Sequence, residues 1–141
     1  MAKGDTIKYL SGVKYVLSDD YSVQTKLRPP ENILTEWVSL GANGMLYIVA
    51  GFGWDGASGP TFDTLNSMRG SLVHDALYSL LRMGELDQKW RQAADEELRD
   101  ICIEDGMSEA RADAWFVSVR MFASECAAVG SDGGKPICVA P

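Results

Sequence analysis

The sequence contains little histidine and little cysteine. Histidine occurs once in 141 residues, and the three cysteines, Cys102, Cys126 and Cys138, are too few and too irregularly spaced for a zinc knuckle or a secreted disulfide framework. We expect free buried thiols. The alternative is a disulfide between Cys126 and Cys138, which requires that the protein enter an oxidising compartment.

A cluster of positive charge and long apolar runs are also missing. The formal net charge is -7, and no cluster of lysine and arginine offsets it locally, so the chain repels nucleic-acid phosphates. No stretch of about 18 apolar residues is present, and the segment MAKGDTIKYL lacks the basic-then-apolar order of a signal peptide. We therefore expect no nucleic-acid partner, no transmembrane segment and synthesis in a cytoplasm.

The residues that are present suit one globular domain. Hydrophobic residues make up 46% of the chain, which at this length is enough to bury a core. We divide the domain, residues 1–141, into a β-rich part with a glycine loop (1–60), a helical part (61–126) and an extended tail (127–141). The tail is rich in glycine and proline, as its segment GSDGGKPICVAP shows.

Residues 8–50 have the pattern of a sheet. Short runs of alternating or β-prone residues occur as VKYVL, YSVQT, EWVSL and MLYIVA. Asn43-Gly44 lies between the last two runs and tolerates the positive φ angles of a tight turn. We therefore expect Trp37–Leu40 to pair antiparallel with Met45–Val49. The prolines of RPPEN favour an exposed connection because they remove backbone donors.

After residue 60 the apolar spacing becomes helical. The first helix contains the stripe from Leu65 to Leu81, stops at Gly84 and carries the histidine. The second extends from about Asp87 to Glu104, and the third begins with Ser108 as its N-cap. An N-terminal antiparallel sheet followed by three helices is an α+β fold. The third helix is expected to bury Trp115, Phe116, Val119, Phe122 and Cys126.

The single histidine, His74, lies among candidate catalytic residues. Tyr78 follows it by four residues and shares its helix face, while Gly70 precedes it by four and leaves space beside the ring, as a pocket wall would. If the first two helices pack antiparallel across MGELDQ, Asp95 reaches the far nitrogen of His74. A carboxylate there fixes the tautomer and supports the imidazolium, as a general base that activates water requires.

The glycine-rich segment GFGWDGASGP precedes the first helix. Its glycines allow backbone carbonyls or amides to turn inward, and Asp55 adds a negative charge. Hard cations such as calcium bind carboxylate and carbonyl oxygens, so Asp55, Asp75 and the loop carbonyls form a candidate calcium site. The alternative is that Asp55 caps a turn or the first helix, as aspartates often do.

At these residues the sequence resembles a phage family. The stretches GFGWDGASGP, LVHDALY, RQAADEEL and ARADAWFVSVRMF occur in the same order as the motifs of the phage-associated domain of unknown function 1353. The likeness covers most of residues 16–122. It implies an origin in a tailed bacteriophage or prophage, and because that family has no settled activity it implies no particular reaction.

A second, local similarity is to secreted phospholipase A2. That enzyme also has a glycine-rich calcium loop, a helix with an H-D-x-x-Y motif and an aspartate on an antiparallel helix. The likeness implies that His74 is the base, that Asp75 binds calcium, and that Tyr78 and Asp95 support them. The chain lacks the cysteines that flank the phospholipase histidine and its loop lies further upstream, so the similarity is one of local chemistry.

Two functions of different classes follow from these residues. In the first, the protein is an ester or amide hydrolase that uses His74 and acts on lipid or cell wall, with a bacterial envelope component as its target. In the second, it is a non-catalytic virion component: His74 ties the glycine loop to the helix, Asp95 accepts buried N–H groups, and the sheet edge or tail binds other virion proteins. An open cleft at His74 favours the enzyme, and a sealed one favours the structural role.

Overall fold

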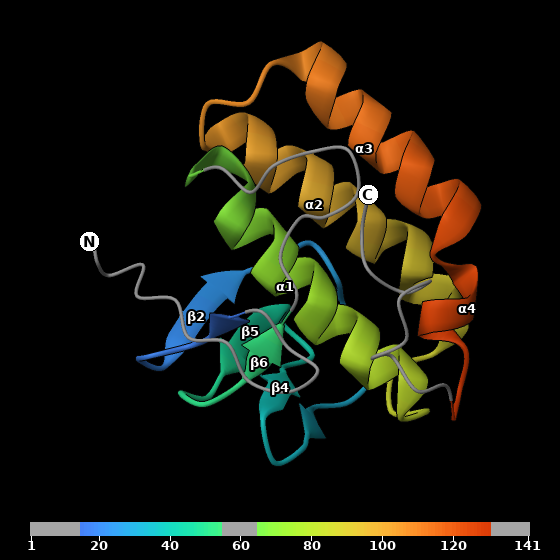
Figure 1. Cartoon of the computed structure of the whole chain (residues 1–141). Helices are drawn as coiled ribbons and strands as arrows, with labels where there is room; N and C mark the ends of the chain where they lie inside the picture. The colour runs from blue at the N-terminus through green and yellow to red at the C-terminus, as the bar shows by residue number, and fades with distance from the viewer. Residues whose placement is uncertain (1–14, 55–64, 131–141) are drawn as a thin grey trace.

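The computed structural model describes residues 15–54 and 65–130 (Figure 1). The first range forms six short strands, β1 (Tyr15–Val16), β2 (Tyr21–Gln24), β3 (Ile33–Leu34), β4 (Val38–Leu40), β5 (Met45–Ile48) and β6 (Gly53–Trp54). The second forms α1 (Leu65–Arg82), the 3-10 turn η1 (Gln88–Trp90), α2 (Arg91–Glu104), α3 (Glu109–Phe122) and the short α4 (Ser124–Ala127). Strands therefore precede three main helices within these ranges, which confirms the α+β prediction.

The strands form two antiparallel sheets. β1 pairs with β6, and the larger sheet has the order β2-β5-β4-β3. The hairpin predicted from Asn43-Gly44 is present: Leu40 pairs with Leu46, and Gly44 has a φ of 90°. The N–H of Gly44 donates to the carbonyl of Gly41 at 2.8 Å, which closes the turn. The RPPEN connection before β3 is exposed apart from one buried proline.

The helix ends follow local signals in the sequence. Gly84 and Gly106 have φ angles of 75° and 106°, a conformation that costs a glycine little and stops a helix. Ser108 caps α3 by accepting the N–H of Arg111. The second predicted helix begins instead as η1, because the Asp87 carboxylate caps a 3-10 turn before α2 starts.

The third helix is too short to contain all the residues that the sequence predicted to be buried on it. α3 ends at Phe122, so Cys126 belongs to α4 and is buried there. Trp115 and Val119 are buried as predicted, but Phe116 is only half-buried because it lies at the edge of the face that contacts α2. The side chain of Phe122 lies outside the described set.

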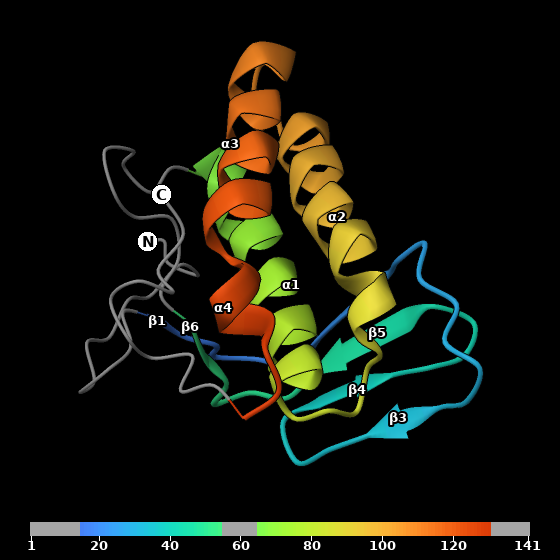
Figure 2. The ribbon, with the colours of Figure 1, turned by 90° about the vertical axis from the view of Figure 1, so that its right-hand side faces the viewer.

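The molecule is layered, with α1 between the sheets and the other helices. α1 contacts β4, β6 and α2, and α3 packs on α2 (Figures 1 and 2). Apolar side chains of the larger sheet and of α1 form the main core, among them Val38, Leu40, Leu46, Ile48, Leu77, Leu80 and Leu81. A smaller core between α2 and α3 includes Leu98, Cys102, Ala112, Trp115 and Val119. This arrangement places α2 between two helices that both carry polar side chains toward it.

Gly70 has a different role from the one predicted. A Cβ atom built on Gly70 would lie 2.8 Å from Cys102 Sγ and 3.2 Å from the Leu98 carbonyl oxygen, both on α2. The glycine therefore lets α1 and α2 approach closely and does not open a pocket wall beside His74. The face of α1 that carries Gly70 is thus part of the contact between α1 and α2.

The cysteines divide into two kinds. Cys126 is disulfide-bonded, so the expectation of a free thiol is wrong for that residue, and the pairing proposed with Cys138 involves a residue outside the described ranges. Cys102 is a buried free thiol, as expected. Burial raises the pKa of the Cys102 thiol to about 11, which leaves it protonated and unreactive. No helix in residues 15–54 and 65–130 is long and apolar enough to cross a membrane.

Replacing Gly70 by alanine tests this close helix contact. In a free helix the change would stabilise the protein by about 1 kcal/mol through helix propensity. Here the added methyl group meets Cys102 and the α2 backbone, so we expect the free energy of unfolding in urea to fall, by about 1–3 kcal/mol. In a Cys102→Ala background the loss should be smaller because the nearest atom is gone. An increase in stability for Gly70→Ala would contradict the contact.

Candidate active site

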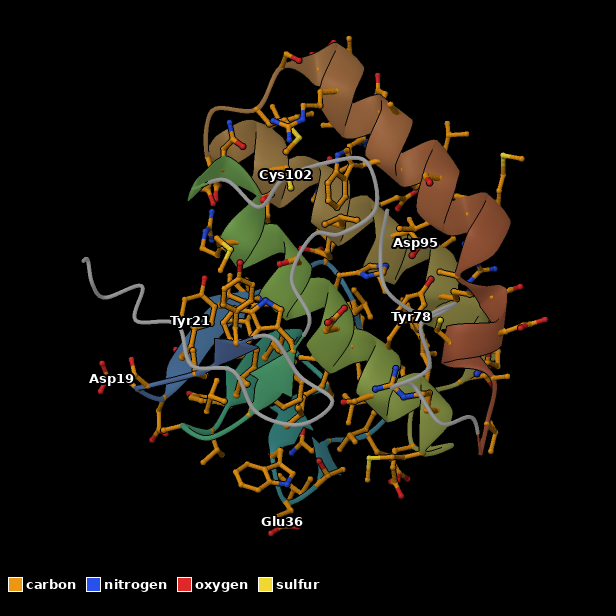
Figure 3. All side chains as sticks on the ribbon, in the orientation of Figure 1. Asp19, Tyr21, Glu36, Tyr78, Asp95 and Cys102 are labelled. Atoms are coloured by element: carbon orange, nitrogen blue, oxygen red, sulfur yellow. The ribbon has the colours of Figure 1, made fainter. Side chains whose placement is uncertain are left out.

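Three helices converge on one carboxylate. His74 and Tyr78 lie one turn apart on α1, and Asp95 faces them from α2. The imidazole Nε2 lies 2.7 Å from Asp95 Oδ1, the contact predicted from the antiparallel packing of the two helices. The phenol of Tyr78 donates to the same oxygen, also at 2.7 Å, and Figure 3 shows this side chain directed toward Asp95. The predicted contact between His74 and Asp95 is therefore present.

The second oxygen of Asp95 is bound from the opposite side. Arg120, near the C-terminus of α3, donates Nη1–H to Asp95 Oδ2 at 2.8 Å. Asp95 has no exposed surface, so every one of these donors compensates for lost hydration. The carboxylate thus links α1, α2 and α3 through two oxygens and three donors.

Arg91, the first residue of α2, extends this network. Its Nε–H donates to the Tyr78 hydroxyl at 3.1 Å, and its Nη2 donates to the carbonyls of Val119 and Arg120 at 2.9 and 3.0 Å. Those carbonyls belong to the last turn of α3, where a cation interacts favourably with the helix dipole. Arg91 therefore holds the tyrosine and the end of α3 together.

Sequence reasoning missed both arginines. They occur within RQAADEEL and ARADAWFVSVRMF, two of the stretches that resemble the phage family, and this resemblance is the only signal that pointed to them. Helical spacing did not place Arg91 or Arg120 near His74, because a long guanidinium side chain can reach a neighbouring helix from several starting positions. Their partners became identifiable only once α3 was seen to pack on α2.

The network sets the protonation states of its members. Burial alone would lower the pKa of His74, but the nearby carboxylates of Asp75 and Asp95 outweigh it, so the His74 pKa is raised. Burial would raise the pKa of Asp95, yet its contacts with His74, Tyr78 and Arg120 lower that pKa. Burial and the Asp95 charge together raise the pKa of Tyr78, which keeps the phenol neutral and able to donate.

Asp75 lies on the other side of the imidazole ring. Its Oδ1 is 3.9 Å from His74 Nδ1, and its side chain is 28% exposed. The surroundings of the two ring nitrogens therefore differ: Nε2 contacts the fully buried Asp95, and Nδ1 lies near the partly exposed Asp75. The ring itself is 4% exposed, so the site is closed around the imidazole in this structure.

The described residues do not by themselves form a calcium site. Across 15–54 and 65–130, no group of three or more His, Cys, Asp and Glu side chains is arranged to hold a metal ion. Asp75 supplies one carboxylate, whereas calcium takes six to eight oxygen ligands. The other predicted ligand, Asp55, lies outside the described residues, so calcium binding stays a prediction that depends on it and on the loop carbonyls.

The His74 pKa can be measured directly because His74 is the only histidine in the chain. We expect its ring NMR signals to titrate above the ordinary value of 6.5. In Asp95→Asn the ring stays buried but loses the carboxylate charge, so its pKa should fall. A midpoint at or below 6.5 in the parent protein would show that burial outweighs the two carboxylates.

The same shift predicts how stability depends on pH. A raised folded-state pKa means that protonated His74 stabilises the fold fully below pH 6.5, and that this contribution is lost as the pH rises through the raised value. Urea unfolding across that window should show a falling free energy in the parent and a flatter dependence in His74→Gln. Equal slopes in the two proteins would contradict the linkage.

Comparison of the chain with the profiles of known protein families, with curated proteins and with solved structures returns no match.

Proposed function

We propose that the protein is a His/Asp-dependent hydrolase of esters or amides, with His74 as its general base. The observation that carries the proposal is the 2.7 Å contact between His74 Nε2 and the buried Asp95 Oδ1. This contact commits one ring nitrogen to Asp95 and leaves Nδ1, on the Asp75 side, as the nitrogen that can accept a proton from water.

The surrounding groups suit that chemistry. With the Nε2 proton donated to Asp95, the neutral tautomer presents its lone pair at Nδ1. When Nδ1 takes a proton, the new imidazolium is stabilised by Asp95, whose own charge is held in place by Tyr78 and Arg120. These dipoles and charges are already oriented before the reaction, so little reorganisation is needed when charge develops.

The proposal also covers the origin of the protein and the substrate of the reaction. The order of the GFGWDGASGP and LVHDALY motifs supports a bacteriophage or prophage origin. A phage hydrolase of esters or amides finds its substrates in the bacterial envelope, as lipid or cell wall. The local similarity to phospholipase A2 favours lipid, since it extends to the histidine, the tyrosine and the aspartate that meet here.

The second candidate function is a non-catalytic virion structural or assembly component. It is favoured by the burial of the site: the imidazole is 4% exposed and Asp95 is fully buried. A network that joins three helices is also a means of holding a fold together. In this case His74 is a structural residue, and its raised pKa reflects the two neighbouring carboxylates, Asp75 and Asp95.

Substitution of His74 distinguishes the two functions. We expect the parent protein to hydrolyse phospholipid vesicles or purified peptidoglycan, assayed with and without calcium, and His74→Gln to lower kcat by a factor of about 100 to 10,000. Glutamine retains an N–H donor for Asp95, so the variant protein should stay folded, but glutamine cannot act as a base. His74→Asn serves as a second replacement.

The activity of the parent protein should also depend on pH. Because the His74 pKa is raised, parental activity should increase with pH as the ring loses its proton.

Glu97→Gln is the matched control. Glu97 is another buried carboxylate of α2, but it accepts the backbone N–H of Lys26 at 2.7 Å, away from the histidine. Its substitution should leave kcat unchanged. If the parent hydrolyses neither substrate and the His74 variants only lower the melting temperature or block particle assembly, the structural candidate replaces the hydrolase. If the parent protein is active, Asp75→Asn tests calcium dependence. This variant should lose more of the calcium-stimulated activity than of the calcium-free turnover.

A further inference from the structure

The outer face of α3 is apolar and exposed. α3 lies on the far side of α2 from α1 and the sheet, where no other described element covers its outer surface (Figure 1). Val117 and Met121 on this face are 52% and 65% exposed, and Ala110 and Ala114 are exposed in line with them. The opposite face carries the side chains that pack on α2. Exposed apolar side chains in one row of a helix indicate a contact surface.

The row has the spacing of a coiled-coil seam. Ala110, Ala114, Val117 and Met121 follow one another at intervals of four, three and four residues, the alternation that keeps one stripe facing a partner helix. In this register the seam lies opposite Ala112 and Val119, both fully buried in the small core beneath α3. The seam and the internal packing face therefore do not compete for the same side chains.

Charges beside the seam select one partner and one direction. Asp113 and Arg120 lie on the same flank of the row, each one residue before a seam position. Two α3 helices that run antiparallel with Ala114 opposite Val117 bring Asp113 of each copy beside Arg120 of the other. A parallel pair would place Asp113 beside Ser118, with no ion pair. The charge pattern is thus complementary to a second, antiparallel copy of itself.

We propose that a second copy of this chain docks on α3 to form a twofold dimer through an antiparallel α3–α3 contact. Such a contact is isologous, because the same face is used by both copies. Ala114 packs against Val117 of the second copy, and Ala110 packs against its Met121. Small residues opposite larger ones allow the helix axes to lie close.

Arg120 can serve this contact without leaving the internal network. Its Nη1 is bound to Asp95, but its side chain is still 32% exposed, and a guanidinium carries five N–H donors. The remaining donors are available to Asp113 of the second copy. The dimer contact does not depend on the proposed hydrolase activity, since it uses the outer surface of α3.

Sedimentation velocity of the full-length protein over a range of concentrations tests the proposal. We expect a reversible dimer, with Val117→Glu and Met121→Glu each raising the dissociation constant at least about tenfold, since a charge is then buried in an apolar contact. Asp113→Arg should also weaken the dimer, because it places a second cation beside Arg120. All three positions are exposed or lie beside the seam, so circular dichroism should show an unchanged fold.

Tyr47→Glu is the matched control. Tyr47 is 56% exposed on the open face of the larger sheet, near exposed Leu34 and Trp37, and its substitution should leave the dimer intact. Loss of the dimer in Tyr47→Glu but not in Val117→Glu would place the interface on the sheet and overturn the proposal. A parent protein that stays monomeric at every concentration would overturn it too.

Cysteine cross-linking tests the register. The antiparallel pairing places position 114 of one copy opposite position 117 of the other. An equimolar mixture of Ala114→Cys and Val117→Cys proteins should therefore form a disulfide-linked dimer faster than either variant alone. Equal rates in the mixture and in the separate variants would rule out this register.

Discussion

The structure depends on how the carboxylate of Asp95 is accommodated. Removing a carboxylate completely from water is costly unless hydrogen-bond donors replace its hydration. The imidazole of His74 and the phenol of Tyr78 bind it from α1, and the guanidinium of Arg120 binds it from α3. Each donor works only at hydrogen-bond distance, so the carboxylate constrains the position of both neighbouring helices relative to α2.

Other features of the helical layer are compatible with that constraint. Gly70 lets α1 approach α2 closely enough for the polar side chains of the two helices to meet. Arg91 joins the Tyr78 hydroxyl to the last carbonyls of α3, so the end of that helix is held beside the network. The same contacts would preorganise a catalytic histidine and stabilise a purely structural one. This is why stability and turnover must be measured on the same variants.

The distribution of charge separates the interior from the surface. The chain as a whole is acidic, with a net charge of -7, yet two arginines are directed into the helical layer, where they neutralise Asp95 and the α3 terminus. Arg120 is the residue that belongs to both regions, because it binds Asp95 and remains partly exposed beside the seam of α3. A contact at the α3 surface would therefore involve Arg120, a side chain that also belongs to the buried network.

Local spacing in the sequence determined the β-to-helix order, the Asn43-Gly44 hairpin, the helix stop at Gly84 and the meeting of His74 with Asp95. These follow from backbone preferences and from the fixed geometry of two helices joined by a short turn.

Tertiary structure alone decided the rest. It directed Gly70 toward α2, placed Cys126 on a separate helix, closed the ring of His74 from solvent and brought Arg91 and Arg120 to the site. Such features depend on which helix faces pack together and on how far a flexible guanidinium extends. Periodicity along one helix predicts neither the packing partner of a helix face nor the reach of a guanidinium, because both depend on residues distant in the sequence.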